Sequence, residues 1–174
     1  MARVLEIAQL GHPVLRQIAE PVAEIDDAVR QLIDDLFATS ENANGAGIAA
    51  PQVYVSSRVF ILSIRPTARY PNAPDVEPMA VINPEILWAS AEKEKDWEGC
   101  LSVPGIRGKV PRPREIAVRF MTGDGKTVER SFSGFAARVF LHENDHLDGL
   151  TWLDQVENNQ DIVSEKEYLR VITA

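Results

Sequence analysis

The pattern of hydrophobic and polar positions predicts short strands framed by helices. Residues 25–37 place hydrophobic side chains three or four positions apart with acids between them, which is typical of an amphipathic helix. That helix is expected to end within residues 42–45, where Asn and Gly gather. A last helix is predicted from Ser164, because its hydroxyl and the carboxylate of Glu167 form a capping-box pattern.

The strands predicted between these helices are short and do not alternate with helices. The clearest are a hairpin, 116–121 with 127–132, joined through a Gly-Asp-Gly turn. Residues 65–78 contain four prolines and are expected to form a surface loop. Further strands are predicted at 58–64, 79–82 and 86–89. This order predicts one α+β domain over residues 1–174, with small antiparallel sheets packed around a central metal-binding helix and further N- and C-terminal helices.

That central helix carries the chain's most informative residues. Hydrophobic residues at helical spacing run up to the sequence His-Glu-Asn-Asp-His, with Ser133 as the expected cap and Gly149 as the expected stop. His142 and His146 lie one turn apart on the same helix face, so both can bind one metal ion. Glu143 stands beside them, where a carboxylate can take a proton from a water molecule at the metal.

A catalytic metal site needs a third protein ligand, with one position open to water. The longer pattern with a third histidine is excluded, because Trp152 occupies that position. Cys100 is the preferred candidate, since the glycines around it allow the backbone to turn tightly and approach another element. A glutamate ligand, Glu165 or Glu167, is the alternative left open.

Composition narrows the class of protein further. The chain has 174 residues, 45% hydrophobic and 25% charged, as expected of a globular domain with its own core. Its net charge of −8 argues against a general nucleic-acid binder, and no hydrophobic run is long enough to span a bilayer. With one cysteine the chain can form no internal disulfide, which suits a reducing compartment. No DNA or membrane partner is therefore expected.

Three ordered motifs resemble those of peptide deformylases. They are Gly-Ala-Gly-Ile-Ala-Ala-Pro-Gln at 45–52, Glu-Gly-Cys-Leu-Ser at 98–102 and His-Glu-Asn-Asp-His-Leu at 142–147. The likeness also covers residues 11–16 and 82–84. One departure is visible, because Leu141 stands where the family usually has Gln. That position is not a ligand, so local packing is expected to differ while the chemistry survives.

The resemblance implies a role for each motif. Cys100, His142 and His146 bind the metal, and Glu143 is the acid and base. Gln52 and the backbone N–H of Leu101 donate to the oxyanion. The implied reaction is hydrolysis of the formyl group of formyl-methionyl nascent polypeptides, with release of formate, by water whose pKa the metal lowers toward about 7.

Substrate binding is expected along the first two motifs and on the metal-binding helix. Small residues there allow an extended peptide to pair with the backbone, and apolar residues one turn before the ligands can line a methionine pocket. A local basic run is expected to be solvated, as most such runs are; it consists of Arg107, Lys109, Arg112 and Arg114. The alternatives are that Arg107 steadies a loop at the site, or that the run meets ribosomal RNA. The expected substrate-binding residues are Gly45, Ala46, Gly47, Ile48, Glu98, Gly99, Arg107, Phe135 and Val139.

The expected cofactor is one divalent ion per chain. Cys/His/His ligands suit several first-row metals, and the resemblance implies Fe²⁺, with Zn²⁺, Ni²⁺ or Co²⁺ possible in a purified sample. The expected partners are formyl-methionyl nascent peptides and the ribosome near its exit tunnel. A bacterial cytoplasm is the expected location, with a trimmed organellar form as the alternative.

Two other functions compete with this prediction. One is a zinc peptidase that cuts ordinary peptide bonds with a glutamate ligand in place of Cys100. The other is a non-catalytic descendant that binds only peptide or metal. Retention of Glu143, Gln52 and Cys100 together argues against the second.

Overall fold

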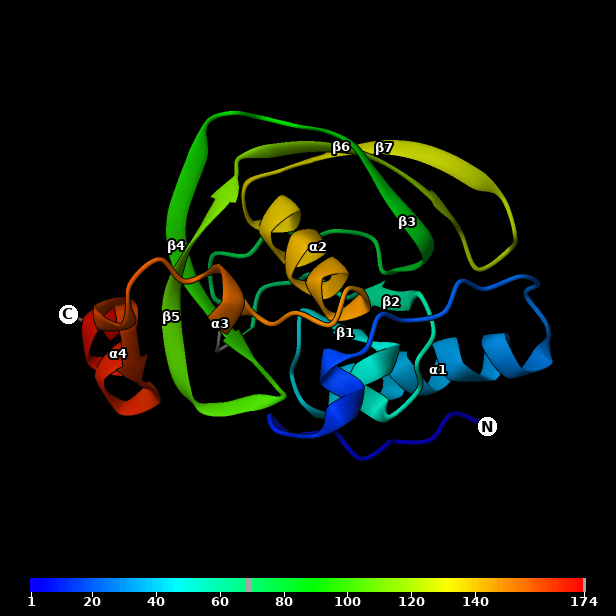
Figure 1. Ribbon diagram of the computed structural model, residues 1–174, viewed down its shortest axis with the longest axis horizontal. Coiled ribbons are helices and arrows are strands. Elements are labelled where there is room, and N and C mark those ends of the chain that lie inside the picture. The colour runs from blue at the N-terminus through cyan, green and yellow to red at the C-terminus, as the bar shows by residue number, and fades with distance from the viewer. Residues whose placement is uncertain (68–69, 174) are drawn as a thin grey trace.

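The computed structural model describes residues 1–67 and 70–173. Two antiparallel sheets surround one buried helix (Figure 1). The five-stranded sheet has the order β1-β2-β3-β6-β7, and the three-stranded sheet has the order β4-β5-β8. The strands are β1 Gly47–Ala49, β2 Val59–Leu62, β3 Met79–Ala89, β4 Lys93–Cys100, β5 Val103–Pro113, β6 Glu115–Met121, β7 Thr127–Ser133 and β8 Ile162–Ser164.

Helix α2 lies between the sheets, while α1 and α4 lie at opposite sides of the molecule (Figure 1). This arrangement confirms the α+β prediction, with a central helix and further N- and C-terminal helices. The α-helices are α1 Asp27–Asn42, α2 Gly134–Leu147, α3 Trp152–Gln155 and α4 Glu165–Thr173, and the 3-10 helices are η1 Pro13–Arg16, η2 Ala50–Val53 and η3 Asn159–Asp161.

The largest core cluster holds α2 against the five-stranded sheet. Phe140 of α2 is fully buried and meets the rings of Phe60, Phe132 and Phe120 at centroid distances of 5.1, 5.4 and 6.3 Å. Leu141, the departure from the usual Gln, belongs to the same cluster and is 8% exposed. Burial of several aromatic rings, each contributing roughly 2–3 kcal/mol, fixes the helix and therefore the direction of its other face.

Several sequence predictions are confirmed, with shifted boundaries. The first helix begins at Asp27 instead of residue 25, because Asp26 caps it by accepting from the Val29 N–H at 2.9 Å. The hairpin forms as β6 and β7, in continuous register. Ser164 accepts a hydrogen bond from the Glu167 N–H at 3.3 Å, which is half of the predicted capping box.

One prediction about strands is wrong. Residues 79–82 and 86–89 belong to one strand, β3, which continues across a register shift where Asn83 takes a φ of 49°. The segment around Cys100 is the end of a long β4–β5 hairpin, which the sequence analysis did not predict. The predicted loop 65–78 has no helix or strand in its described part; residues 68 and 69 lie outside the described residues.

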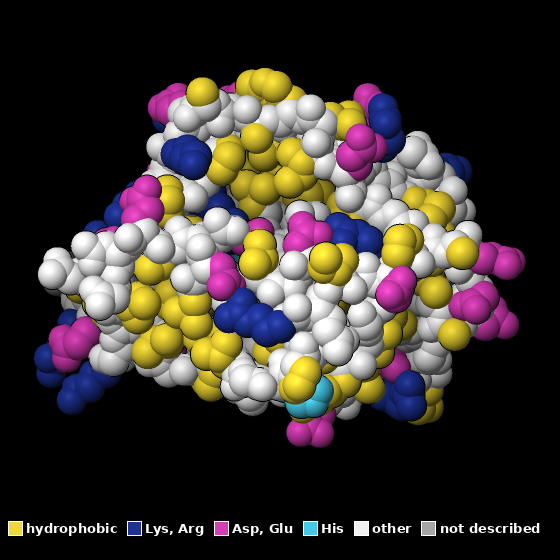
Figure 2. Space-filling view, viewed as in Figure 1, with side chains coloured by type: hydrophobic (Ala, Val, Ile, Leu, Met, Phe, Trp, Pro, Cys, Tyr) yellow, Lys and Arg dark blue, Asp and Glu magenta, His cyan; other side chains and the backbone are white. Residues whose placement is uncertain are grey.

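The described helices contain no segment long and apolar enough to cross a bilayer. On the face shown in Figure 2, charged side chains are scattered over the middle as well as around the outline, and hydrophobic side chains gather in a hollow in the upper part.

Candidate metal and catalytic site

Helix α2 presents His142 and His146 on the face opposite its aromatic anchor. Both side chains are buried, and their ring centroids lie 5.2 Å apart. The helix stops before Gly149, whose φ of 72° is costly for other residues. Ser133 occupies the cap position as predicted, but its side chain makes no capping hydrogen bond.

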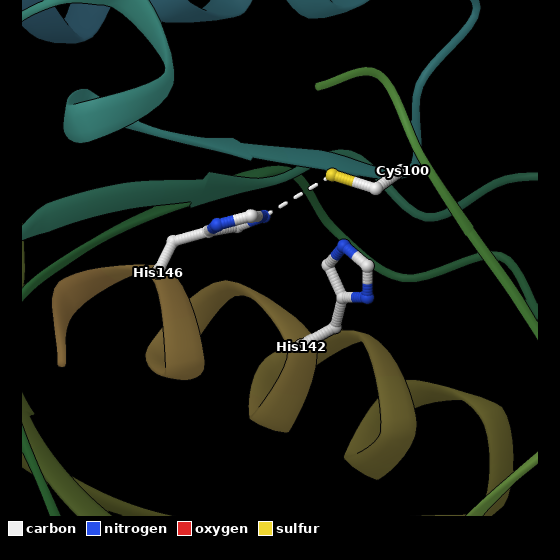
Figure 3. Close-up of side chains that lie close together, drawn as sticks. All are labelled: Cys100, His142 and His146. Atoms are coloured by element: carbon white, nitrogen blue, oxygen red, sulfur yellow. Dashed lines mark hydrogen bonds between the residues drawn. The ribbon is translucent and has the colours of Figure 1, made fainter. Parts of the chain in front are cut away.

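Cys100 approaches the two histidines from the end of β4. Its Sγ lies 3.3 Å from His146 Nε2, and one ligand atom from each of the three residues lies within 4.8 Å of the others (Figure 3). Burial raises the pKa of the Cys100 thiol, but His146 and His142 more than offset it and hold the pKa well below its ordinary value. The site therefore favours a thiolate, the form that binds metal.

These three donors fit a divalent transition metal. Zinc-type bonds of about 2.0–2.3 Å in a tetrahedron put neighbouring ligand atoms roughly 3.5 Å apart, close to the separation of Cys100 and His146. Glu165, the alternative ligand, instead accepts from Arg107 at 3.0 Å, and Glu167 pairs with Arg170 at 2.9 Å. Among the described residues, Cys100, His142 and His146 are the one such group.

Glu98 orients the first histidine. Its Oε2 lies 3.5 Å from His142 Nδ1, which leaves the other ring nitrogen to face Cys100. Arg112 donates to both carboxylate oxygens at 2.9 and 3.0 Å and also to Asp145 at 2.7 Å. Burial alone would raise the pKa of Glu98, but the hydrogen bond to His142 and the charge of Arg112 lower it to about 2. Glu98 is thus a buried carboxylate held ionised.

Glu143 is buried beside the ligand group. It is 4% exposed, and its Oε2 has no hydrogen-bond partner among the described atoms. Burial raises the pKa of Glu143 to about 7, although His142 and His146 act in the opposite direction. Gly47 lies against it, since a Cβ there would stand 2.9 Å from Glu143 Oε1. The carboxylate is therefore held in place with one oxygen available.

Gln52 is fixed at both ends of its amide. Its Oε1 accepts from the Ala49 N–H at 2.9 Å, and its Nε2 donates to Ser102 Oγ at 3.1 Å and to Cys100 Sγ at 3.4 Å. One amide hydrogen is therefore aimed at the thiol that would bind the metal. Sequence reasoning missed Ser102, the acceptor that orients Gln52.

A cavity opens in front of these groups. Of the predicted substrate-binding residues, seven line it: Gly45, Ala46, Gly47, Glu98, Gly99, Phe135 and Val139. Sequence reasoning missed Tyr70, Trp97 and Arg138, which line it as well. Tyr70 comes from the proline-rich loop and packs against Phe135, with 5.2 Å between the ring centroids.

Two predicted residues have side chains away from this cavity. Ile48 is fully buried in the cluster facing α1, so only its backbone is available to a peptide. Arg107 is 1% exposed and lies behind Gly99. The expectation that the basic run is solvated is wrong for Arg107 and for Arg112, which is 5% exposed. Arg112 pairs with the buried Glu98, while Arg107 packs against Gly99 and donates to Tyr70 and Glu165. Lys109 and Arg114 are exposed.

Comparison with known proteins agrees with this geometry. The family described as Polypeptide deformylase matches residues 4–161. Peptide deformylase 2 of Nostoc sp. is 52% identical over 171 residues, which cover 98% of this chain and 96% of that protein. Peptide deformylase of Pseudothermotoga lettingae is 39% identical over 169 residues, 97% of this chain and 92% of that protein.

Solved structures give the same result. A class I type b peptide deformylase from Acinetobacter baumannii, bound to Met-Ala-Ser, superposes with a TM-score of 0.87 at 44% identity, covering 90% of this chain and all of that one. Peptide deformylase from Thermotoga maritima superposes with a TM-score of 0.80 at 38% identity, covering 90% of this chain and 99% of that one.

Proposed function

The chain belongs to the peptide deformylase family, and on that premise we propose how its own residues carry out the reaction. It is a metal-dependent hydrolase that removes the N-terminal formyl group from nascent peptides. The observation that carries the proposal is the convergence of three ligand atoms within 4.8 Å beside a buried carboxylate with a free oxygen.

Cys100, His142 and His146 would hold the metal. When bound, the ion supplies Lewis acidity toward the formyl oxygen and makes water acidic enough to ionise near neutral pH. We propose Fe²⁺ as the working ion, because the resemblance to the family implies it; Zn²⁺, Ni²⁺ and Co²⁺ suit the same ligands. Glu98 orients His142 through its contact with Nδ1, and Arg112 holds Glu98 in place by donating to its carboxylate.

Glu143 moves the proton. It takes a proton from the attacking water, whose oxygen forms a bond to the formyl carbon. The bond from that carbon to the peptide nitrogen then breaks, Glu143 gives its proton to the nitrogen, and formate leaves beside the new amine. The partnerless Oε2 and the deep burial of Glu143 support this role.

Gln52 and the Leu101 N–H stabilise the developing oxyanion. The position of Gln52 Nε2 beside Cys100 Sγ supports this role, because an oxygen close to the metal would lie within its reach. One such donor contributes roughly 3 kcal/mol to transition-state stabilisation. The peptide extends between the two glycine-rich motifs, with Gly45–Gly47 on one side and Glu98–Gly99 on the other.

The methionine side chain is proposed to enter the apolar part of the cavity at Phe135 and Val139. The similar proteins named above come from bacteria, so we propose a bacterial cytoplasm as the place of action. The ribosome near its exit tunnel is proposed as a partner solely because the substrate emerges there.

Two variants test the assignment of roles. Protein prepared without oxygen is assayed for formate release from formyl-Met-Ala-Ser, and its metal is measured by elemental analysis. Cys100→Ala is expected to lose most bound metal, since only two protein ligands remain. Glu143→Gln is expected to keep its metal while kcat falls at least about 100-fold. Full metal content in Cys100→Ala, or near wild-type turnover in Glu143→Gln, would overturn the corresponding role.

A further inference from the structure

Arg107 joins two parts of the chain that lie far apart in sequence. Its Nη1 donates to the Tyr70 hydroxyl at 3.1 Å, and its Nη2 donates to Glu165 at 3.0 Å. The guanidinium carbon lies 4.8 Å from the Tyr168 ring centroid and 5.7 Å from that of Tyr70. One buried cation therefore connects a loop before β3 with the C-terminal helix α4.

The same side chain supports the backbone next to the metal ligand. A Cβ on Gly99 would stand 2.7 Å from the Cδ, Nε and Cζ atoms of Arg107, so the arginine lies flat against this glycine. Gly99 lines the cavity directly before Cys100, where the β4–β5 register shifts. Displacement of Arg107 would therefore leave the backbone at Gly99, which forms one wall of the cavity, without its packing support.

Helix α4 also supports a second aromatic residue of the cavity. Tyr168, the buried residue of α4, meets the Trp97 ring edge-on at a centroid distance of 5.4 Å. Trp97 lines the cavity, as does Tyr70, which packs against Phe135. Tyr70 and Trp97 thus both depend on α4, one through Arg107 and the other through Tyr168.

We infer that α4 braces the pocket for the first side chain of the substrate, and that Glu165 is a positioning residue acting through Arg107. This inference rests on the proposed pocket at Phe135 and Val139. Glu165 touches none of the reacting groups, and its side chain is 42% exposed. Its loss leaves the buried guanidinium without its anionic partner, so Arg107 shifts and Tyr70 loses its fixed position against Phe135.

The test compares kcat/KM for formyl-Met-Ala-Ser and formyl-Ala-Ala-Ser in metal-loaded full-length protein. Glu165→Gln and Tyr70→Phe each remove one partner of Arg107. Each is expected to lower the preference for Met over Ala at least about threefold, mainly through KM for the Met peptide. The double variant is expected to lose no more than the larger single loss, because both act through the same arginine. Glu167→Gln is the matched control, since its exposed pair with Arg170 lies on the same helix.

Each other outcome overturns the inference. Three results would exclude bracing through Arg107. The first is an unchanged preference for Met over Ala in Glu165→Gln, and the second is an equal loss of that preference in Glu167→Gln. The third is a double variant whose fold-loss of preference equals the product of the two single losses. A wild-type enzyme that releases formate but does not distinguish Met from Ala would remove the proposed pocket as well. Absence of formate release from wild type would instead overturn the proposed function. Thermal melting confirms that the compared variants are folded.

Discussion

Replacement of Arg112 by methionine should destabilise the protein far more than replacement of its neighbour Arg114. Arg112 is 5% exposed and bonds to Glu98 and Asp145, whose side chains are 3% and 12% exposed. Methionine fills similar space but leaves two carboxylates buried without their shared cation. Breaking a buried ion pair from one side costs about 3–5 kcal/mol.

That cost translates into a measurable melting shift. For a domain of this size, 1 kcal/mol lowers the melting temperature by about 2–4 °C, so Arg112→Met should melt about 6–20 °C below wild type at pH 7. Arg114→Met is the control, because its pair with Glu92 spans 2.9 Å between side chains that are 52% and 71% exposed. Exposed pairs contribute about 0–1 kcal/mol, so the control should shift by only a few degrees.

The pH dependence gives an independent check. The folded protein holds the pKa of Glu98 at about 2, below its ordinary value of 4.5. Because the folded pKa is the lower one, this carboxylate stabilises the fold above about pH 4.5, and the contribution is lost as pH falls through about 2. The difference in melting temperature between wild type and Arg112→Met should therefore narrow as the pH falls from about 4.5 toward 2. A shift no larger than that of the control, or one that widens in acid, would refute the reasoning.

Two remaining predictions concern the catalytic groups. Ser102→Ala removes the hydroxyl that accepts a hydrogen bond from Gln52, so kcat should fall about tenfold while the metal content stays unchanged. This loss is smaller than that expected for removal of a whole oxyanion donor. An unchanged kcat in steady-state kinetics would contradict this prediction. Gly47→Ala places a methyl group 2.9 Å from Glu143 Oε1 and from the Ile61 carbonyl oxygen, so the carboxylate must move and kcat should fall at least about tenfold. Full activity in that variant would show that the position of Glu143 is not critical.

The sequence was most informative where function depends on spacing along one element. His142, Glu143 and His146 share a helix, so their relation follows from helical geometry alone. The hairpin 116–132 was predictable for the same reason, since a turn of fixed length sets its register. The glycines around Cys100 made it the preferred third ligand, and the resemblance to a known family supplied Gln52; these two residues lie 42 and 90 positions before His142.

Features that depend on contacts between distant segments were missed. The strand β5 contains two arginines, both buried only because Glu98, Asp145 and Glu165 meet them across 14, 33 and 58 positions. In sequence such a segment is indistinguishable from a solvated loop. Tyr70 was missed likewise, because a proline-rich loop has no periodicity to show which side chain turns inward.

The central claim is that this site hydrolyses a formyl group and rejects larger acyl groups. An acetyl carbon carries a methyl group that must fit between the attacking water, the donors Gln52 and Leu101, and the nearby Gly47 and Cys100. Overlap costing about 3 kcal/mol would give more than hundredfold selectivity. The direct measurement is kcat/KM for formyl-Met-Ala-Ser against acetyl-Met-Ala-Ser, with internal cleavage followed by mass spectrometry. A formyl preference above about 100-fold without internal cleavage is predicted; comparable rates on the two peptides, or cleavage inside them, would contradict the account.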